Sequence, residues 1–121
     1  MSSDNEQTRQ VLDHHMAAVD EGNIDAVLSD YAENAVLLTP KGPKRGHTEI
    51  RPVLEWLLAN IFTKGASFTM IQEAVEGEVA YIVWSAESER YRVPLATDTY
   101  VVRDGKIVVQ TFAAKPEAKH P

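Results

Sequence analysis

The sequence predicts an α+β domain in which helices cover one face of a curved, mainly antiparallel sheet. Apolar residues recur with helical spacing in the first half of the 121-residue chain, and the part after residue 67 reads as strands. Asp104-Gly105 separates two β-rich runs, which is a strong short-range signal of a hairpin. We therefore expect a single domain over residues 1–121, with residues 115–121 as a loose tail.

Three amphipathic segments are expected to be helices. They cover residues 4–21, 24–31 and 48–61. Gly22 ends the first segment, and Asn23 is placed to cap the second. Pro52 lies close enough to the start of the third helix to be tolerated there. His15 falls near the centre of the apolar stripe of the first helix, so an imidazole is expected to point inward.

Five segments are expected to be strands. They cover residues 36–39, 67–76, 79–87, 91–102 and 107–114. A turn at residues 41–43 follows the first of them, and Pro94 indicates an edge position or a bulge in the fourth. Residues 79–84 place apolar side chains on both faces of a strand, and three helices cannot cover both faces of such a sheet. The sequence therefore predicts a homodimer through the outer sheet face.

The fourth strand places an acid in an apolar row. Side chains alternate between the faces of a strand, so Ala96, Asp98, Tyr100 and Val102 share one face. The other members of this row are small, aromatic or apolar. An acid in such a row needs a partner, a proton or a function.

Composition excludes several classes of function. The net charge of −6 opposes binding to phosphate backbones, and the basic cluster at residues 41–47 has no interleaved aromatic residues. No apolar run approaches the ~18–20 residues of a membrane span. The absence of cysteine fits a cytoplasmic, reducing location. His14 and His15 diverge by about 100° on a helix, and no phosphate loop or metal-ligand spacing occurs, so we expect no metal or cofactor.

Four segments carry a family resemblance: His15–Asp25, Tyr31–Val36, Arg45–Ile50 and Asp98–Ile107. In this order and spacing they resemble the ketosteroid isomerase-like, SnoaL-like branch of the NTF2-like superfamily. The resemblance covers residues 8–113 and implies a cone, in which a curved sheet wraps three helices around a deep pocket, usually within a dimer. It says little about the reaction, because one fold hosts many functions.

The resemblance also implies roles for individual residues. Asp98 matches the strand acid that in ketosteroid isomerases stays protonated and donates to an enolate oxygen. His15 falls where those enzymes carry the tyrosine of the oxyanion hole, and Thr39 falls where they carry the aspartate that moves the proton. A threonine hydroxyl is not a useful base near neutral pH, so steroid isomerase activity is not expected. The expected ligand-binding residues are Met16, Tyr31, Thr39, Leu54, Tyr100 and Phe112.

Two interpretations of His15 and Asp98 remain open from the sequence. The two side chains either meet across a cavity as a catalytic acid–base dyad, or each is a structural group with its own hydrogen-bond partner. We therefore expect a protein that binds a small apolar carbonyl or enol compound and acts as a cofactor-free isomerase, cyclase or dehydratase. The alternative is a non-catalytic ligand carrier or protein-interaction module of the same fold.

Overall fold

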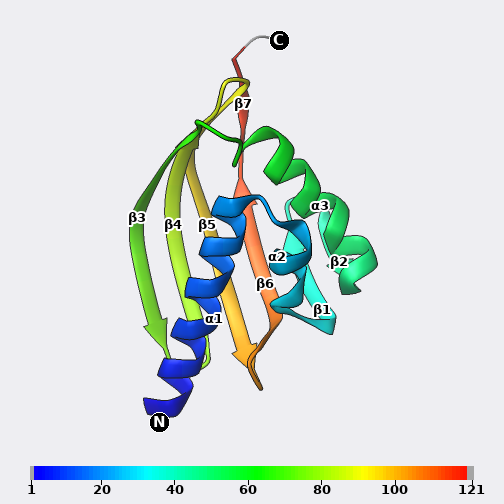
Figure 1. Cartoon of the computed structure of the whole chain (residues 1–121), viewed down its shortest axis with the longest axis vertical. Helices are drawn as coiled ribbons and strands as arrows, with labels where there is room; N and C mark the ends of the chain where they lie inside the picture. The colour runs from blue at the N-terminus through cyan, green and yellow to red at the C-terminus, as the bar shows by residue number, and fades with distance from the viewer. Residues whose placement is uncertain (1, 120–121) are drawn as a thin grey trace.

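A computed structural model describes residues 2–119 of the chain. The helices are α1 (Ser2–Glu21), α2 (Ile24–Ser29) and α3 (Gly46–Asn60), and the strands are β1 (Tyr31–Thr39), β2 (Gly42–Arg45), β3 (Ser67–Glu76), β4 (Val79–Glu87), β5 (Tyr91–Arg103), β6 (Lys106–Ala114) and β7 (Glu117–Ala118). The strand order is β2-β1-β6-β5-β4-β3, and β7 pairs with β5 outside this path. The sheet curves around the helices (Figure 1), which confirms the predicted α+β class.

The helix ends follow local sequence signals. Gly22 adopts a φ of 70° directly after α1, a conformation that costs glycine little. The Asn23 side chain accepts a hydrogen bond from the Ala26 amide at 3.1 Å, so it caps α2 as predicted. Helix α3 begins at Gly46, two residues earlier than expected, and Pro52 therefore lies inside it without ending it.

The predicted β5–β6 hairpin is present, with a two-residue turn and a register shift between Val101 and Val102. Arg103 pairs with Lys106, and the two residues between them, Asp104 and Gly105, have φ angles of 52° and 75°. Pro94 lies where the β4–β5 register shifts, so it occupies a bulge and removes no regular ladder bond. Strand β6 pairs antiparallel with β5 on one side and parallel with β1 on the other.

Three predicted boundaries are wrong. Tyr31 begins β1 instead of ending the second helix, because the Asp30 carbonyl accepts the Ile107 amide at 2.7 Å and starts the pairing of β1 with β6. Residues 42–45, expected in part as a turn, form β2 against β1. In the tail expected to be loose, β7 pairs with residues 91 and 92 of β5. Residues 120 and 121 lie outside the described part of the chain.

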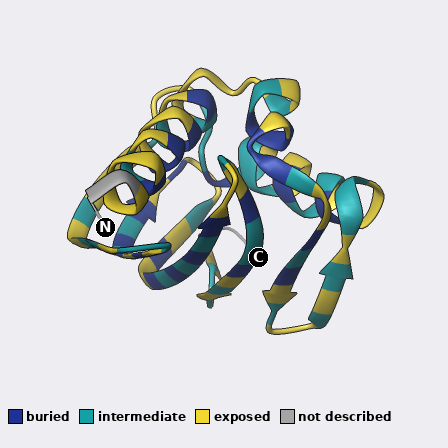
Figure 2. Ribbon diagram, turned by 90° about the horizontal axis from the view of Figure 1, so that it is seen from below, coloured by how far each residue is buried: buried dark blue, intermediate teal, exposed yellow. Residues whose placement is uncertain are grey.

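The concave face of the sheet and the helices enclose the core (Figure 2). The inward row of β5 is buried as the alternation predicts, and it consists of Ala96, Asp98, Tyr100 and Val102. The opposite face exposes large apolar side chains, among them Ile71, Val79, Tyr81 and Leu95. The predicted uncovered face is therefore present, whereas the homodimer stays a prediction.

Candidate functional site

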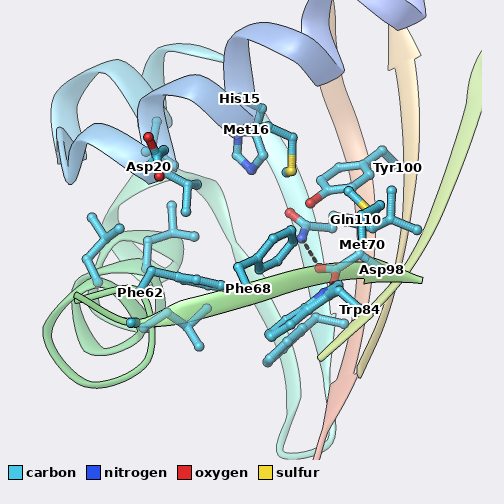
Figure 3. Close-up of a pocket in the computed structure, with 18 of the residues that line it drawn as sticks. His15, Met16, Asp20, Phe62, Phe68, Met70, Trp84, Asp98, Tyr100 and Gln110 are labelled. Carbon is cyan, nitrogen blue, oxygen red and sulfur yellow. Dashed lines mark hydrogen bonds between the residues drawn. The ribbon is translucent and has the colours of Figure 1, made fainter. Parts of the chain in front are cut away.

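A cavity of about 420 Å³ opens between the concave face of the sheet and helices α1 and α3. Figure 3 shows that His15 and Met16 enter it from α1, while Asp98 and Tyr100 enter it from the opposite, sheet side. Most of the wall is apolar, including Val19, Val27, Leu57, Phe62, Phe68 and Ile82. A few polar groups converge in an otherwise apolar hollow, which is typical of a small-molecule site.

Asp98 is held by one donor on each neighbouring strand. The Trp84 indole Nε1 on β4 donates to Asp98 Oδ1 at 2.7 Å, and the Gln110 amide Nε2 on β6 donates to Asp98 Oδ2 at 2.7 Å. Both donors are diagonal neighbours: Asp98 stands opposite Ile82 and Phe112, two positions away from each donor along its strand. Such diagonal pairs on one face lie within reach of long side chains.

Tyr31 fixes the orientation of the Gln110 amide. The buried Tyr31 hydroxyl donates to Gln110 Oε1, so the amide nitrogen is the atom that faces Asp98. Burial, followed by the nearby charges of Asp98 and Asp30, raises the pKa of Tyr31 well above its ordinary value. The hydroxyl therefore keeps its proton and remains a donor.

Burial determines the acidity of Asp98. Only 4% of this residue is exposed, and loss of hydration raises its pKa from 3.8 to about 6. The hydrogen bonds from Trp84 and Gln110 act in the opposite direction, as does the charge of His15. Both oxygens accept hydrogen bonds, which are the contacts of a carboxylate, whereas the resemblance implies a protonated acid that donates.

His15 lines the same cavity as Asp98, but its hydrogen-bond partner is Asp30. Its Nδ1 lies 3.2 Å from Asp30 Oδ2, and His14 Nδ1 lies 2.7 Å from Asp30 Oδ1. No hydrogen bond joins His15 to Asp98 among residues 2–119. The His15 ring instead makes edge contacts with Tyr31 and Tyr100, at centroid distances of 5.5 and 5.4 Å. Asp30 thus joins a buried histidine to a half-exposed one.

The other predicted site residues divide into three groups. Met16, Leu54, Tyr100 and Phe112 line the cavity. Tyr31 is buried behind the wall, where it supports Gln110. The prediction for Thr39 is wrong: its hydroxyl donates to the Gly42 carbonyl at 2.9 Å in the β1–β2 turn, away from the cavity. A polar residue at the end of a strand that runs into a tight turn satisfies its own turn, and this local contact decided its position.

Sequence reasoning missed Asp30 and Trp84. Asp30 follows α2 directly, and its contact with α1 depends on how the two helices pack, which no local pattern reveals. Trp84 carried a usable signal, because β4 alternation places it on the same face as Ala80 and Ile82. Gln110 stands two positions along β6 from Phe112, the residue directly opposite Asp98.

Comparison with known proteins identifies the family. The model of the SnoaL-like domain matches residues 12–110, so the chain belongs to the SnoaL-like family. No curated protein matches it. The chain is similar to many solved structures of the same fold.

Three of these structures illustrate the range of the fold. A Kribbella flavida protein provisionally described as a ketosteroid isomerase is 17% identical, with 98% of this chain and 84% of that chain covered and a TM-score of 0.75. A SnoaL-like protein of unknown function from Burkholderia thailandensis is 18% identical, with 91% and 95% covered and a TM-score of 0.70. An LEH-like epoxide hydrolase from M. tuberculosis is 13% identical, with 92% and 84% covered and a TM-score of 0.70. These likenesses show the fold alone.

Two further features of the described residues bear on the class of protein. Between residues 2 and 119, no group of three or more histidine, aspartate or glutamate side chains is placed to hold a metal ion. Over the same range, no helix has the length and apolar character needed to cross a bilayer.

Proposed function

We propose that the protein binds a small, largely apolar organic molecule in this cavity and performs cofactor-free acid–base chemistry on it, with Asp98 as the general base. The observation that carries the proposal is a buried carboxylate in an apolar hollow, held by two N–H donors, with a pKa of about 6. A pKa near the working pH is what efficient proton transfer requires.

The chemistry follows from the polar groups that line the cavity. Asp98 removes a proton from a carbon next to a carbonyl, the electrons of the broken C–H bond form a carbon–carbon double bond, and the π electrons of the carbonyl move to its oxygen. The Tyr100 hydroxyl and the His15 ring lie on the same cavity and supply donors to that oxygen. Return of the proton to another carbon completes an isomerisation, whereas loss of a neighbouring hydroxyl as water completes a dehydration.

The proposal does not extend to steroid isomerisation. The resemblance places the proton-moving residue of those enzymes at Thr39, which lies outside the cavity and bonds its own turn. The base is therefore assigned to Asp98, whose two oxygens are aligned as acceptors.

Exchange of carbon-bound hydrogen tests this assignment without knowledge of the natural substrate. A panel of small cyclic ketones is incubated with the protein in D₂O, and loss of the α-proton signal is followed by NMR. We expect the protein to accelerate exchange of at least one ketone, and Asp98→Asn to lower that rate by 10²–10⁴-fold, the usual contribution of a general base. Thr39→Ala is the matched control and leaves the rate unchanged. Equal rates for the wild type and Asp98→Asn would refute the role of Asp98.

The alternative is a ligand carrier of the same fold, and one observation favours it. Trp84 and Gln110 already occupy one lone pair on each Asp98 oxygen, as they do when a buried acid is purely structural. Tight binding of a ketone without any hydrogen exchange would support this alternative.

We also propose that the protein is a homodimer through the outer face of the sheet. Support comes from the exposed side chains of Val79 and Tyr81 on β4 and of Leu95 on β5, which leave an apolar surface in water. Light scattering coupled to gel filtration measures the mass, and Tyr81→Lys is expected to convert the dimer to a 13.5 kDa monomer. A monomeric wild type would contradict the proposal.

A further inference from the structure

The charges around the cavity are of one sign. Four carboxylates line it: Asp98 in the interior, Asp13 and Asp20 on α1, and Glu73 on β3. Among residues 2–119, no lysine or arginine belongs to the lining. Arg9 pairs with Glu73 and lies 4.0 Å from Asp13, so it offsets part of this charge from outside the cavity. An anion entering this hollow loses its hydration and meets these carboxylates, and within the described part of the chain the His15 imidazole is the one basic group of the wall.

The wall beside Asp98 is aromatic. Phe62, Phe68 and Trp84 contact one another pairwise, with ring centroids 5.1–6.0 Å apart. Tyr100 adds a fourth ring to the lining. The faces of aromatic rings attract cations, and a carboxylate next to several rings is the combination by which proteins bind organic ammonium groups.

Besides Asp98, the Tyr100 hydroxyl is a buried polar group at the cavity. Tyr100 is 4% exposed, and no hydrogen bond joins its hydroxyl to another residue between positions 2 and 119. In that range no fully enclosed polar side-chain atom is unpaired, so the hydroxyl oxygen touches the open cavity. Figure 3 shows this hydroxyl directed inward, toward the side of the cavity where His15 and Gln110 lie. A buried hydroxyl in this position is available to the polar group of a ligand.

We infer that the cavity selects a small apolar molecule that carries a cationic nitrogen, such as a protonated amine, and that it rejects anionic molecules of the same shape. The inference rests on the proposed function, because it concerns the ligand of the same cavity. The apolar body packs on the aromatic and aliphatic wall. The nitrogen lies in the electrostatic field of Asp98 and of the other three carboxylates of the lining, Asp13, Asp20 and Glu73.

A matched set of ligands tests the inference on the wild-type protein. 1-Naphthylmethylamine, 1-naphthalenemethanol and 1-naphthoic acid share one apolar body and are cationic, neutral and anionic at pH 7.5. Binding is read from the NMR signal of the Trp84 indole N–H, which bonds Asp98 directly. The Trp56 indole on α3 does not line the cavity and serves as an internal reference. We expect the amine to bind at least tenfold more tightly than the alcohol, and the acid to bind most weakly.

Two variants locate the effect. Asp98→Asn is expected to reduce the affinity for the amine to that for the alcohol, and Asp20→Asn to reduce it about threefold. Asp104→Asn removes the same charge from the exposed hairpin turn and is expected to change nothing. Equal affinities for all three ligands, or a preference for the acid, would overturn the charge selectivity and leave small-molecule binding intact. Failure of all three ligands to shift the Trp84 signal would overturn both the selectivity and the proposed function.

Discussion

Asp98 makes the stability of the protein depend on pH in a direction that is unusual for an acid. Its pKa is raised from 3.8 to about 6 in the folded chain, so between these values the native state binds a proton that the unfolded state has released. The contribution of Asp98 to stability is then fully present below pH 3.8 and is lost as the pH rises through 6. The difference of about 2.2 pH units corresponds to about 3 kcal/mol, because one unit is worth about 1.4 kcal/mol.

Urea unfolding of the wild type and Asp98→Asn between pH 4 and 7.5 measures this contribution. We expect the difference in free energy of unfolding between the wild type and the variant to fall by about 2–3 kcal/mol across this range. Any loss of stability caused by the altered hydrogen bond to Gln110 is nearly independent of pH. It therefore shifts the whole plot of free energy against pH by a constant amount. Asp104→Asn is the control, because that side chain stays in water. A difference that is flat, or that rises with pH, would show that burial does not control the acidity of Asp98.

Two further predictions concern the groups that hold Asp98. Tyr31→Phe leaves the buried Gln110 oxygen without a donor and is expected to lower the free energy of unfolding by about 1–3 kcal/mol in urea titrations, whereas Asp104→Asn in the exposed hairpin turn changes it by less than about 0.5 kcal/mol. Trp84→Phe removes a hydrogen bond that favours the carboxylate, so the pKa of Asp98 is expected to rise above 6 when followed by the NMR shift of its side-chain carbon. An unchanged or lower value would contradict the assigned contact.

Periodic patterns predicted burial better than they predicted the type of element. Tyr31 completes an i, i+3, i+4, i+7 stripe with Ile24, Val27 and Leu28, and it is indeed buried, yet it belongs to a strand. This apolar spacing is consistent with either a helix or a strand at Tyr31. The choice is made by a distant partner, because the amide of Ile107 bonds the Asp30 carbonyl and starts parallel pairing there. Such pairing has no local signature in the sequence.

The candidate site was predictable where it depends on alternation and not where it depends on packing. Alternation along β5 placed Asp98 and Tyr100 inward, and the hairpin turn brought Gln110 to the same face. Of the two interpretations left open by the sequence, the direct His15–Asp98 hydrogen bond is not found among residues 2–119, and the Nδ1 atom of His15 contacts Asp30 instead. Adjacent histidines on a helix diverge, but their side chains are long enough to reach the two oxygens of one carboxylate between them.

Asp98 and His15 are each supported from a different part of the fold. Asp98 is held by β4 and β6, and through Gln110 by Tyr31 on β1, so four neighbouring strands fix one carboxylate. His15 is held by Asp30, which lies between α2 and β1. Substitution of Tyr31 or Asp30, which lie behind the wall and do not line the cavity, therefore alters the acidity or orientation of a group without changing the shape of the cavity wall. Substitution of an apolar wall residue instead changes the shape of the cavity and leaves these supporting hydrogen bonds in place. Measuring pKa and ligand affinity on the same variants separates the two effects, and this separation distinguishes an acid–base site from a passive carrier.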